Sequence, residues 1–310
     1  MNKKKILKGL GNILTVLSII GIIYLIIKLD VDLYIFANVK FISSMIIYGI
    51  ILSLAVLLNS IAWKELLIML TNKTVKLNEI VNIYARSNIN KYLPGNVMHY
   101  ATRNILAAQY NIDQKSIFSA TIFEIIFKIL CASLIVIIFV RNELNIALSS
   151  LGVGSITLIL FLICIIVLAV FGICFFARKN NIYIKSSLIY LFKANVMYIV
   201  VFILNIIVFV NIATIFSKYK LTLNDIFLTS GIYIIAWLIG YLTPGSPGGL
   251  GIRESLMILL LGSIFDYDTV ITISIGVRIV TIFADIFAYF TNFIYVKRGQ
   301  YETNNTNTML

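Results

Sequence analysis

The chain has 310 residues, of which 60% are hydrophobic and only 12% are charged, and its formal net charge is +12. About a quarter of the residues of a soluble globular domain are charged, so the composition excludes a soluble fold and predicts an integral membrane protein. Its basic residues are spread between apolar segments, which is typical of membrane orientation and contact with anionic lipid, so no nucleic-acid partner is expected.

Six apolar segments have the length of a membrane-spanning helix. Two further regions, 80–110 and 226–265, are interrupted by Pro-Gly pairs, and each predicts two short helices joined at the break. The first segment lacks a cleavage site, so we expect it to remain as an anchor. The sequence therefore predicts an all-α polytopic membrane protein with eight hydrophobic segments, the six spans being 13–27, 41–62, 117–140, 156–177, 194–216 and 270–296.

The charges between these segments predict the orientation, because short cytoplasmic loops carry excess lysine and arginine. Lysines at positions 3, 4, 5 and 8 place the N-terminus in the cytoplasm. Lys297 and Arg298 place the end of the last span on the same side. The segment 299–310 is rich in Asn and Thr, and we expect it to be a disordered cytoplasmic tail.

The two halves of the chain show the same order of elements: helix, helix, broken pair, helix. Since each half crosses the membrane an odd number of times, the second must be inverted, as in many transporters. We predict a first membrane repeat over 1–148 and a second, inverted one over 149–298. The offset is 150 residues (244 − 94, 253 − 103 and 278 − 128), matching Pro94-Gly95 with Pro244-Gly245, Arg103 with Arg253 and Lys128 with Arg278.

Each break predicts a helix that starts inside the membrane, where its free N–H groups and dipole favour an anion such as a phosphate. Asn96 is a candidate cap for the first start. Ser246 is a candidate N-cap of the second, with Pro247 at the first helical position. The two starts are expected to converge on one region, where three glycines leave the backbone open to a ligand: Gly248, Gly249 and Gly251.

Ionisable side chains in apolar helices are costly and mark functional sites. Glu124 and Lys128 are four residues apart and share a helix face, and Arg278 and Asp285 share another. For each pair, a structural ion pair that fastens the helices together remains an alternative. The candidates are Arg103, Glu124, Lys128, Arg253, Glu254, Arg278 and Asp285.

Four other kinds of side chain allow a simpler interpretation. Arg103 lies far enough from Gly95 to extend to the cytoplasmic surface. His99 is a candidate proton-sensitive donor, with an ordinary hydrogen-bonded role as the alternative. Trp63 and Trp237 are interpreted as interfacial or packing aromatics. The cysteines, at positions 131, 164 and 174, lie in apolar runs without metal-ligand or disulfide spacing, so we expect no metal, cofactor or disulfide.

Two stretches, YLPGNV followed by Arg103 and PGGLGIRE at 247–254, resemble the motifs of a known family. This is the transmembrane domain of lysylphosphatidylglycerol synthase/flippase proteins, the multiple peptide resistance factors. The resemblance implies a flippase-like domain that moves a lipid between leaflets, aminoacylated phosphatidylglycerol in the two-domain members, and so confers resistance to cationic peptides. Carried over, the motif positions are Pro94, Gly95, Asn96 and Arg103, then Pro247, Gly248, Gly249, Gly251, Arg253 and Glu254.

The synthase activity of that family belongs to a separate soluble domain, which the residues after Arg298 are too few to form. No catalytic residues are assigned, and an enzyme acting alone is not the expectation. The leading hypothesis is an inner-membrane or plasma-membrane flippase for an anionic or aminoacylated phospholipid. The alternatives are a flippase for a polyprenyl-phosphate-linked sugar and a non-transporting subunit of a lipid-modifying or glycosyltransferase system. A separate synthase or glycosyltransferase and a homodimer stay open as partners.

Overall fold

The structure is a computed structural model that describes residues 39–71, 74–93, 97–110, 112–141, 143, 184–217, 220–243 and 245–307. Several sequence predictions lie outside these residues. They are the spans at 13–27 and 156–177, two of the three cysteines, the N-terminal lysines, and the break residues Pro94, Gly95, Asn96 and Pro244.

All the elements of the described residues are helical, and five helices are long and apolar enough to cross a membrane. The prediction of an all-α polytopic membrane protein is therefore confirmed. Four of the five coincide with predicted spans that lie in the described residues. The long helices are α2 (Val39–Thr71), α5 (Gln114–Phe139), α8 (Ile184–Phe216), α9 (Leu223–Leu242) and α11 (Tyr267–Asn307).

Short helices occupy the two regions that the sequence predicts to be broken. Three of them are single 3-10 turns, which is how a helix commonly ends or changes direction. The first region holds α3 (Leu77–Asn88), η2 (Ile89–Tyr92), α4 (Met98–Ala107) and η3 (Ala108–Tyr110), and the second holds η4 (Pro247–Gly249) and α10 (Ile252–Leu261) after α9.

Side-chain caps fix where two of the long helices begin. The Asp113 carboxylate accepts a hydrogen bond from the backbone N–H of Ser116 at the start of α5. Thr222 and Asp225 form a reciprocal capping box at the start of α9. Such caps pair N–H groups that the first helical turn leaves free, and each is worth about 1 kcal/mol.

The structure differs from the sequence predictions in the length of one helix. The second broken region does not contain two short helices, because α9 has 20 residues and is itself long enough to span. Its apolar sequence continues without a proline as far as Leu242, whereas α3 has only 12 residues. At the C-terminus the α11 backbone is helical to Asn307, and the disorder expected of the segment 299–310 stays a prediction.

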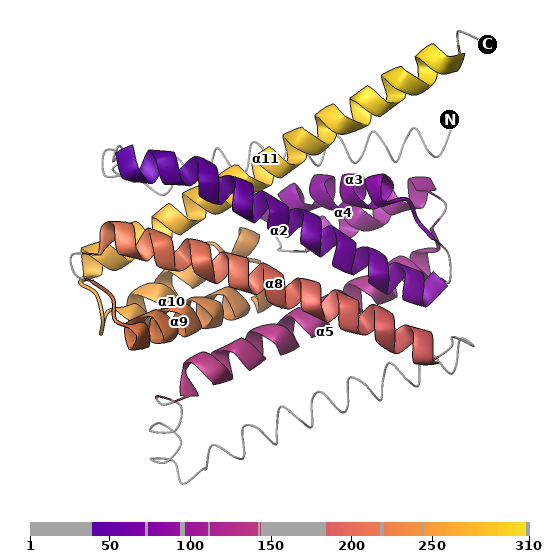
Figure 1. Cartoon of the computed structure of the whole chain (residues 1–310). Coiled ribbons are helices and arrows are strands. Elements are labelled where there is room, and N and C mark those ends of the chain that lie inside the picture. Colours follow the sequence, from indigo (N-terminus) through magenta and orange to yellow (C-terminus); the bar gives the residue numbers. More distant parts are fainter. Residues whose placement is uncertain are drawn as a thin grey trace.

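Helices α2 and α8 pack along each other through the middle of the molecule, with the α3/α4 and α9/α10 pairs toward opposite ends of the view (Figure 1). The other helix contacts come in matching pairs. Helix α5 packs on α9 while α11 packs on α3, and α2 contacts α5 while α8 contacts α11. If α2 to α5 are equivalent to α8 to α11, each of these contacts has its counterpart, which is the arrangement expected of two repeated halves.

Small residues allow the long helices to approach closely, as is usual between membrane helices. Gly49 of α2 lies directly against the ring of Phe283 on α11, where a side chain of any size would overlap it. Gly231 of α9 lies in the same way against Val140, the residue after α5. These contacts fix the distances between the helices that enclose the polar interior.

Candidate functional site

The two helix breaks lie next to each other inside the helix bundle. Turns η2 and η4 are in contact, and the α-carbon of Gly248 is so close to the Tyr92 ring that an added Cβ would lie 3.4 Å from it. Arg278 of α11 fastens η4 from the other side by donating from Nη1 to the Gly248 carbonyl at 3.0 Å. Within the described residues, η2, which precedes the first break, therefore lies against η4 of the second, while the convergence of the two helix starts stays a prediction.

Glycine conformations explain the second break. Gly248 and Gly249 have φ values of +58° and +78°, which residues with a side chain rarely adopt. As predicted, Ser246 is the N-cap and Pro247 begins the turn, but the helix they start is only the 3-10 turn η4. The Ser246 hydroxyl donates to the Leu250 carbonyl at 2.5 Å instead of capping, and α10 begins at Ile252. The helical turn at Pro247 does not continue into α10, because the positive φ angles of Gly248 and Gly249 do not fit an α-helix.

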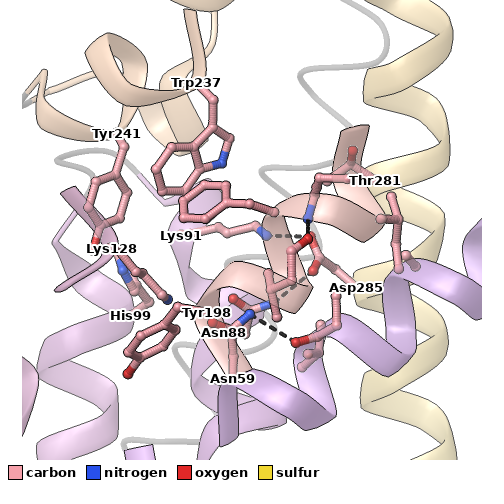
Figure 2. A pocket seen from close by; sticks show the side chains of 18 of the residues that line it. Asn59, Asn88, Lys91, His99, Lys128, Tyr198, Trp237, Tyr241, Thr281 and Asp285 are labelled. Atoms are coloured by element: carbon pink, nitrogen blue, oxygen red, sulfur yellow. Dashed lines mark hydrogen bonds and ion pairs between the residues drawn. The ribbon is translucent and has the colours of Figure 1, made fainter. Parts of the chain in front are cut away.

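A cavity of about 140 Å³ lies at the centre of this arrangement. Each of the eight described α-helices contributes to its wall, and so do both breaks, through Lys91 and Gly248. In the view of Figure 2, Trp237 and Tyr241 lie on one side of the cavity, and Asn59 and Asn88 lie on the opposite side. A cavity needs only about 10–15 Å³ to hold one water, so this one accommodates a larger polar group.

The first charge cluster joins α3, α4 and α5 around one carboxylate. Glu124 forms ion pairs with Arg103 and, at 2.6 Å, with Lys128, and it accepts a hydrogen bond from the Tyr84 hydroxyl at 2.6 Å. Arg103 is 1% exposed and its guanidinium lies 4.0 Å from the centre of the Tyr84 ring. The predicted pairing of Glu124 with Lys128 is confirmed. The interpretation that Arg103 extends to the surface is wrong, because its counter-charge is inside the bundle.

The second cluster surrounds Asp285 on α11. Its two carboxylate oxygens accept hydrogen bonds from Asn88 at 2.7 Å and from Tyr92 at 2.6 Å, and Lys91 forms an ion pair with it at 2.7 Å. Figure 2 shows Lys91 and Asp285 together at the wall of the cavity. Since all three partners belong to α3 or η2, Asp285 attaches the first broken region to the last helix.

Arg278 and Glu254 form the third charged group. Arg278 Nη2 lies 2.9 Å from Glu254 Oε1, and Nε donates to the same oxygen at 3.1 Å. The shared helix face predicted for Arg278 and Asp285 is consistent with their positions, since both line the cavity. They do not pair with each other, because Arg278 pairs with Glu254 of the second broken region and Asp285 pairs with Lys91 of the first.

Arg253 is the cavity cation without a carboxylate partner within the described chain. Its Nε is buried and makes no hydrogen bond, and its guanidinium lies 5.6 Å from the centre of the Trp237 ring. The side chain fits between two glycines, since an added Cβ would lie 2.5 Å from it at Gly240 and 2.6 Å at Gly249. The position of Glu124 in the other half is occupied by Ser274 (274 − 124 = 150), so α11 offers no carboxylate there. A positive charge buried without a counter-charge is costly and favours an anionic ligand.

The cavity as a whole carries excess positive charge. Five cationic side chains line it, against two carboxylates in the wall and a third, Glu254, in an adjoining small cavity. Five cations against three carboxylates leave a formal excess of two. The cations are Lys91, Arg103, Lys128, Arg253 and Arg278.

The structure brings together part of the predicted site. The members that line the main cavity are His99, Arg103, Glu124, Lys128, Gly248, Arg253, Arg278 and Asp285. Glu254 lines only the adjoining one. Ser246, Pro247, Gly249 and Gly251 belong to the loop that shapes the site without lining either cavity. Pro94, Gly95 and Asn96 lie outside the described residues.

Sequence reasoning missed several residues of the cavity wall. Lys91 stands three positions before Pro94, close enough to the break to have suggested a role. Trp237 was interpreted as an interfacial or packing aromatic, although it lines the cavity. Tyr84 was not singled out, although its hydroxyl donates to the carboxylate of Glu124. Asn59 and Asn88 carried no signal, because an isolated asparagine in an apolar helix has no motif.

The comparison with protein families finds a match over most of the chain. The model of the family described as "Lysylphosphatidylglycerol synthase TM region" matches residues 12–288, which is most of the chain. Searches of curated proteins and of solved structures find no match. The matched range includes both breaks and every charged residue of the cavity described above. The chain is therefore a multi-pass membrane protein that belongs to the family of the lysylphosphatidylglycerol synthase transmembrane region.

Proposed function

We propose that this protein is a lipid translocase, which binds the head group of an anionic or aminoacylated phospholipid in the central cavity and moves it between the leaflets. The observation that carries the proposal is the unpaired Arg253 in a cavity with two excess positive charges. A lipid phosphate is the anion that a membrane supplies in quantity, and arginine binds phosphate oxygens in a bidentate manner.

The position of the cavity favours transport over simple lipid binding. It lies where the two helix breaks meet, and paired breaks are found at the substrate sites of transporters built from repeats. The matching contacts of α5 with α9 and of α11 with α3 provide two similar interfaces around one site. A rocking motion between them would open the cavity to one leaflet and then to the other.

Binding at this site leaves the acyl chains outside the cavity. At about 140 Å³ it is far too small for a whole lipid, so only the polar head group would enter. The acyl chains would stay in the hydrocarbon of the bilayer, so moving them from one leaflet to the other exposes no apolar surface to water. We further propose that the protein resides in the cell membrane with both termini in the cytoplasm; the distribution of basic residues supports the orientation.

The test is leaflet exchange in proteoliposomes that contain the purified protein. Labelled phosphatidylglycerol, lysyl-phosphatidylglycerol and a polyprenyl-phosphate sugar are compared, with Arg253→Ala as the site variant. Arg141→Ala is the matched control, since Arg141 is an exposed arginine outside the cavity. We expect exchange of at least one lipid by the wild type and the control, and none by Arg253→Ala. Full exchange by Arg253→Ala would refute the anion site, and no exchange by the folded wild type would refute translocation.

A further inference from the structure

We propose that the cavity selects a head group that has a net negative charge and uncharged hydroxyl groups, and that it disfavours one with a free amino group. This inference rests on the proposed function, since it assumes that a lipid head group is the ligand. The favoured substrates are then phospholipids of the phosphatidylglycerol type or polyprenyl-phosphate sugars of the same chemistry. Lysylated phosphatidylglycerol is disfavoured.

The first argument is that the carboxylates of the main cavity are already occupied. Both oxygens of Glu124 are engaged, one by Arg103 and the other by Lys128 and Tyr84. Both oxygens of Asp285 are engaged as well, by donors from α3 and η2. An entering ammonium group would have to displace a resident cation or donor before it met a negative charge.

Glu254 does not change this conclusion. Its Oε2 makes no hydrogen bond, but the residue lines an adjoining cavity of about 20 Å³, which is close to the volume needed for one water. Arg253 and Arg278 line that same small cavity. An alkylammonium group would have to pass both guanidinium groups and enter a space too small for it.

The second argument is the charge balance of the whole site. A lysyl ester of phosphatidylglycerol has two amino groups against one phosphate, so it would add positive charge to a cavity that already has an excess of two. Phosphatidylglycerol has only the phosphate and reduces the excess. Because like charges repel strongly where water is scarce, the lysyl ester should bind more weakly than phosphatidylglycerol.

The third argument is the presence of unpartnered neutral polar atoms in the cavity wall. Asn59 Oδ1, His99 Nδ1 and the Tyr198 hydroxyl are buried and make no hydrogen bond within the described chain. Leaving such atoms unpaired costs about 1–3 kcal/mol each. Hydroxyl groups of a glycerol or a sugar would pair with them without adding charge, as acceptors or as donors.

Binding can be measured separately from transport by tryptophan fluorescence. Trp237 lines the cavity, and Trp63, the other tryptophan, is fully buried in the core. Short-chain phosphatidylglycerol and its lysyl ester are titrated into the purified protein in a non-ionic detergent. We expect phosphatidylglycerol to bind about tenfold or more tightly than its lysyl ester. Equal or tighter binding of the lysyl ester would overturn the inference.

A negative charge added to the cavity should reduce or remove this preference. Asn59→Asp keeps the side-chain size and makes the unpartnered Oδ1 of residue 59 part of a carboxylate that has no cation partner. Asn211→Asp is the matched control, because Asn211 makes the same bond to the carbonyl four residues before it but does not line the cavity. We expect the ratio of the two affinities to fall about tenfold in Asn59→Asp and to stay unchanged in the control. An unchanged ratio in both would contradict the inference.

Two more arms identify the source of the head group and separate this inference from the proposed function. A polyprenyl-phosphate sugar that binds as well as phosphatidylglycerol supports the same head-group chemistry. Glycerol 3-phosphate that binds as tightly as the lipid would overturn it, since the ligand would then be a soluble anion. Preferred binding of phosphatidylglycerol without leaflet exchange would refute translocation and leave the head-group selectivity intact.

Discussion

Arg103 and Arg253 stand 150 residues apart at corresponding places in the two broken regions, yet Arg103 is paired with Glu124 while no carboxylate pairs with Arg253 in the described chain. The sequence difference behind this is Ser274, which occupies the position that corresponds to Glu124. The second half of the chain therefore has the cation that corresponds to Arg103, which is Arg253, but lacks the carboxylate that corresponds to Glu124. The predictions below test this asymmetry and the fold that supports it.

Replacing Glu124 with glutamine should strongly destabilise the protein. The change leaves the buried Arg103 and the partly buried Lys128 without their counter-charge, and breaking a buried ion pair in this way costs about 3–5 kcal/mol. Thermal unfolding in detergent should show a large fall in the midpoint temperature. Glu143→Gln, at an exposed position, serves as the control and should change little. Similar midpoints for the two variants would mean that the Glu124 cluster is not a stabilising core.

Alanine at Gly249 and at Gly251 should differ in effect although both glycines have a φ near +79°. The backbone strain of about 1–3 kcal/mol is common to both. Only at Gly249 would the new Cβ also lie 2.6 Å from Arg253 Nε, whereas nothing lies within 4 Å at Gly251. We expect Gly249→Ala to abolish lipid binding in the fluorescence titration and Gly251→Ala to retain it. Equal loss in both would show that loop strain matters and the position of Arg253 does not.

Lys91 and Asp285 should be energetically coupled. Each single change, Lys91→Met or Asp285→Asn, leaves a partner without its counter-charge, while the double variant removes both charges. Thermal stabilities of the four proteins give the coupling energy of a double-mutant cycle, which we expect to be about 0.5–3 kcal/mol. Additive effects would indicate that the 2.7 Å pair makes no net contribution to the attachment of η2 to α11.

The contact between α2 and α11 depends on Gly49. Gly49→Ala would force the new methyl group into the Phe283 ring, and overpacking of this kind costs about 1–3 kcal/mol. Phe283→Leu in the same chain should restore most of the stability, because the flat ring is then removed. We would measure unfolding of the two single variants and the double. A double variant less stable than Gly49→Ala alone would argue against this packing.

The predicted inversion of the two halves places the starts of α3 and α9 on opposite sides of the membrane. Lys76 and Lys220 are exposed positions just before these helices. In a chain whose three cysteines are replaced by alanine, we introduce Lys76→Cys or Lys220→Cys and treat intact cells with a membrane-impermeant maleimide. Labelling at 220 and not at 76 is expected. Labelling of both, or of neither, would contradict the inverted repeat.

Composition and local pattern were sufficient to determine the class of the protein and the places where its helices break. Apolar length gave the spans found in α2, α5, α8 and α11, because a bilayer sets a minimum length for a crossing helix. The Pro-Gly pairs marked both broken regions, since proline and glycine end helices for local steric reasons. Glu124 and Lys128 could be paired from their spacing alone, because four residues bring side chains to one face of a helix.

The tertiary structure alone decided which charges meet across the bundle. Asp285 is bonded by Asn88, Tyr92 and Lys91, almost 200 residues earlier in the chain, and no local pattern encodes such a contact. Spacing could not distinguish Arg103, which is neutralised by Glu124, from Arg253, which is not, since both follow a Pro-Gly pair at the same distance. The difference arises from how α5 and α11 pack against the two broken regions, and that packing leaves one buried cation available to a ligand.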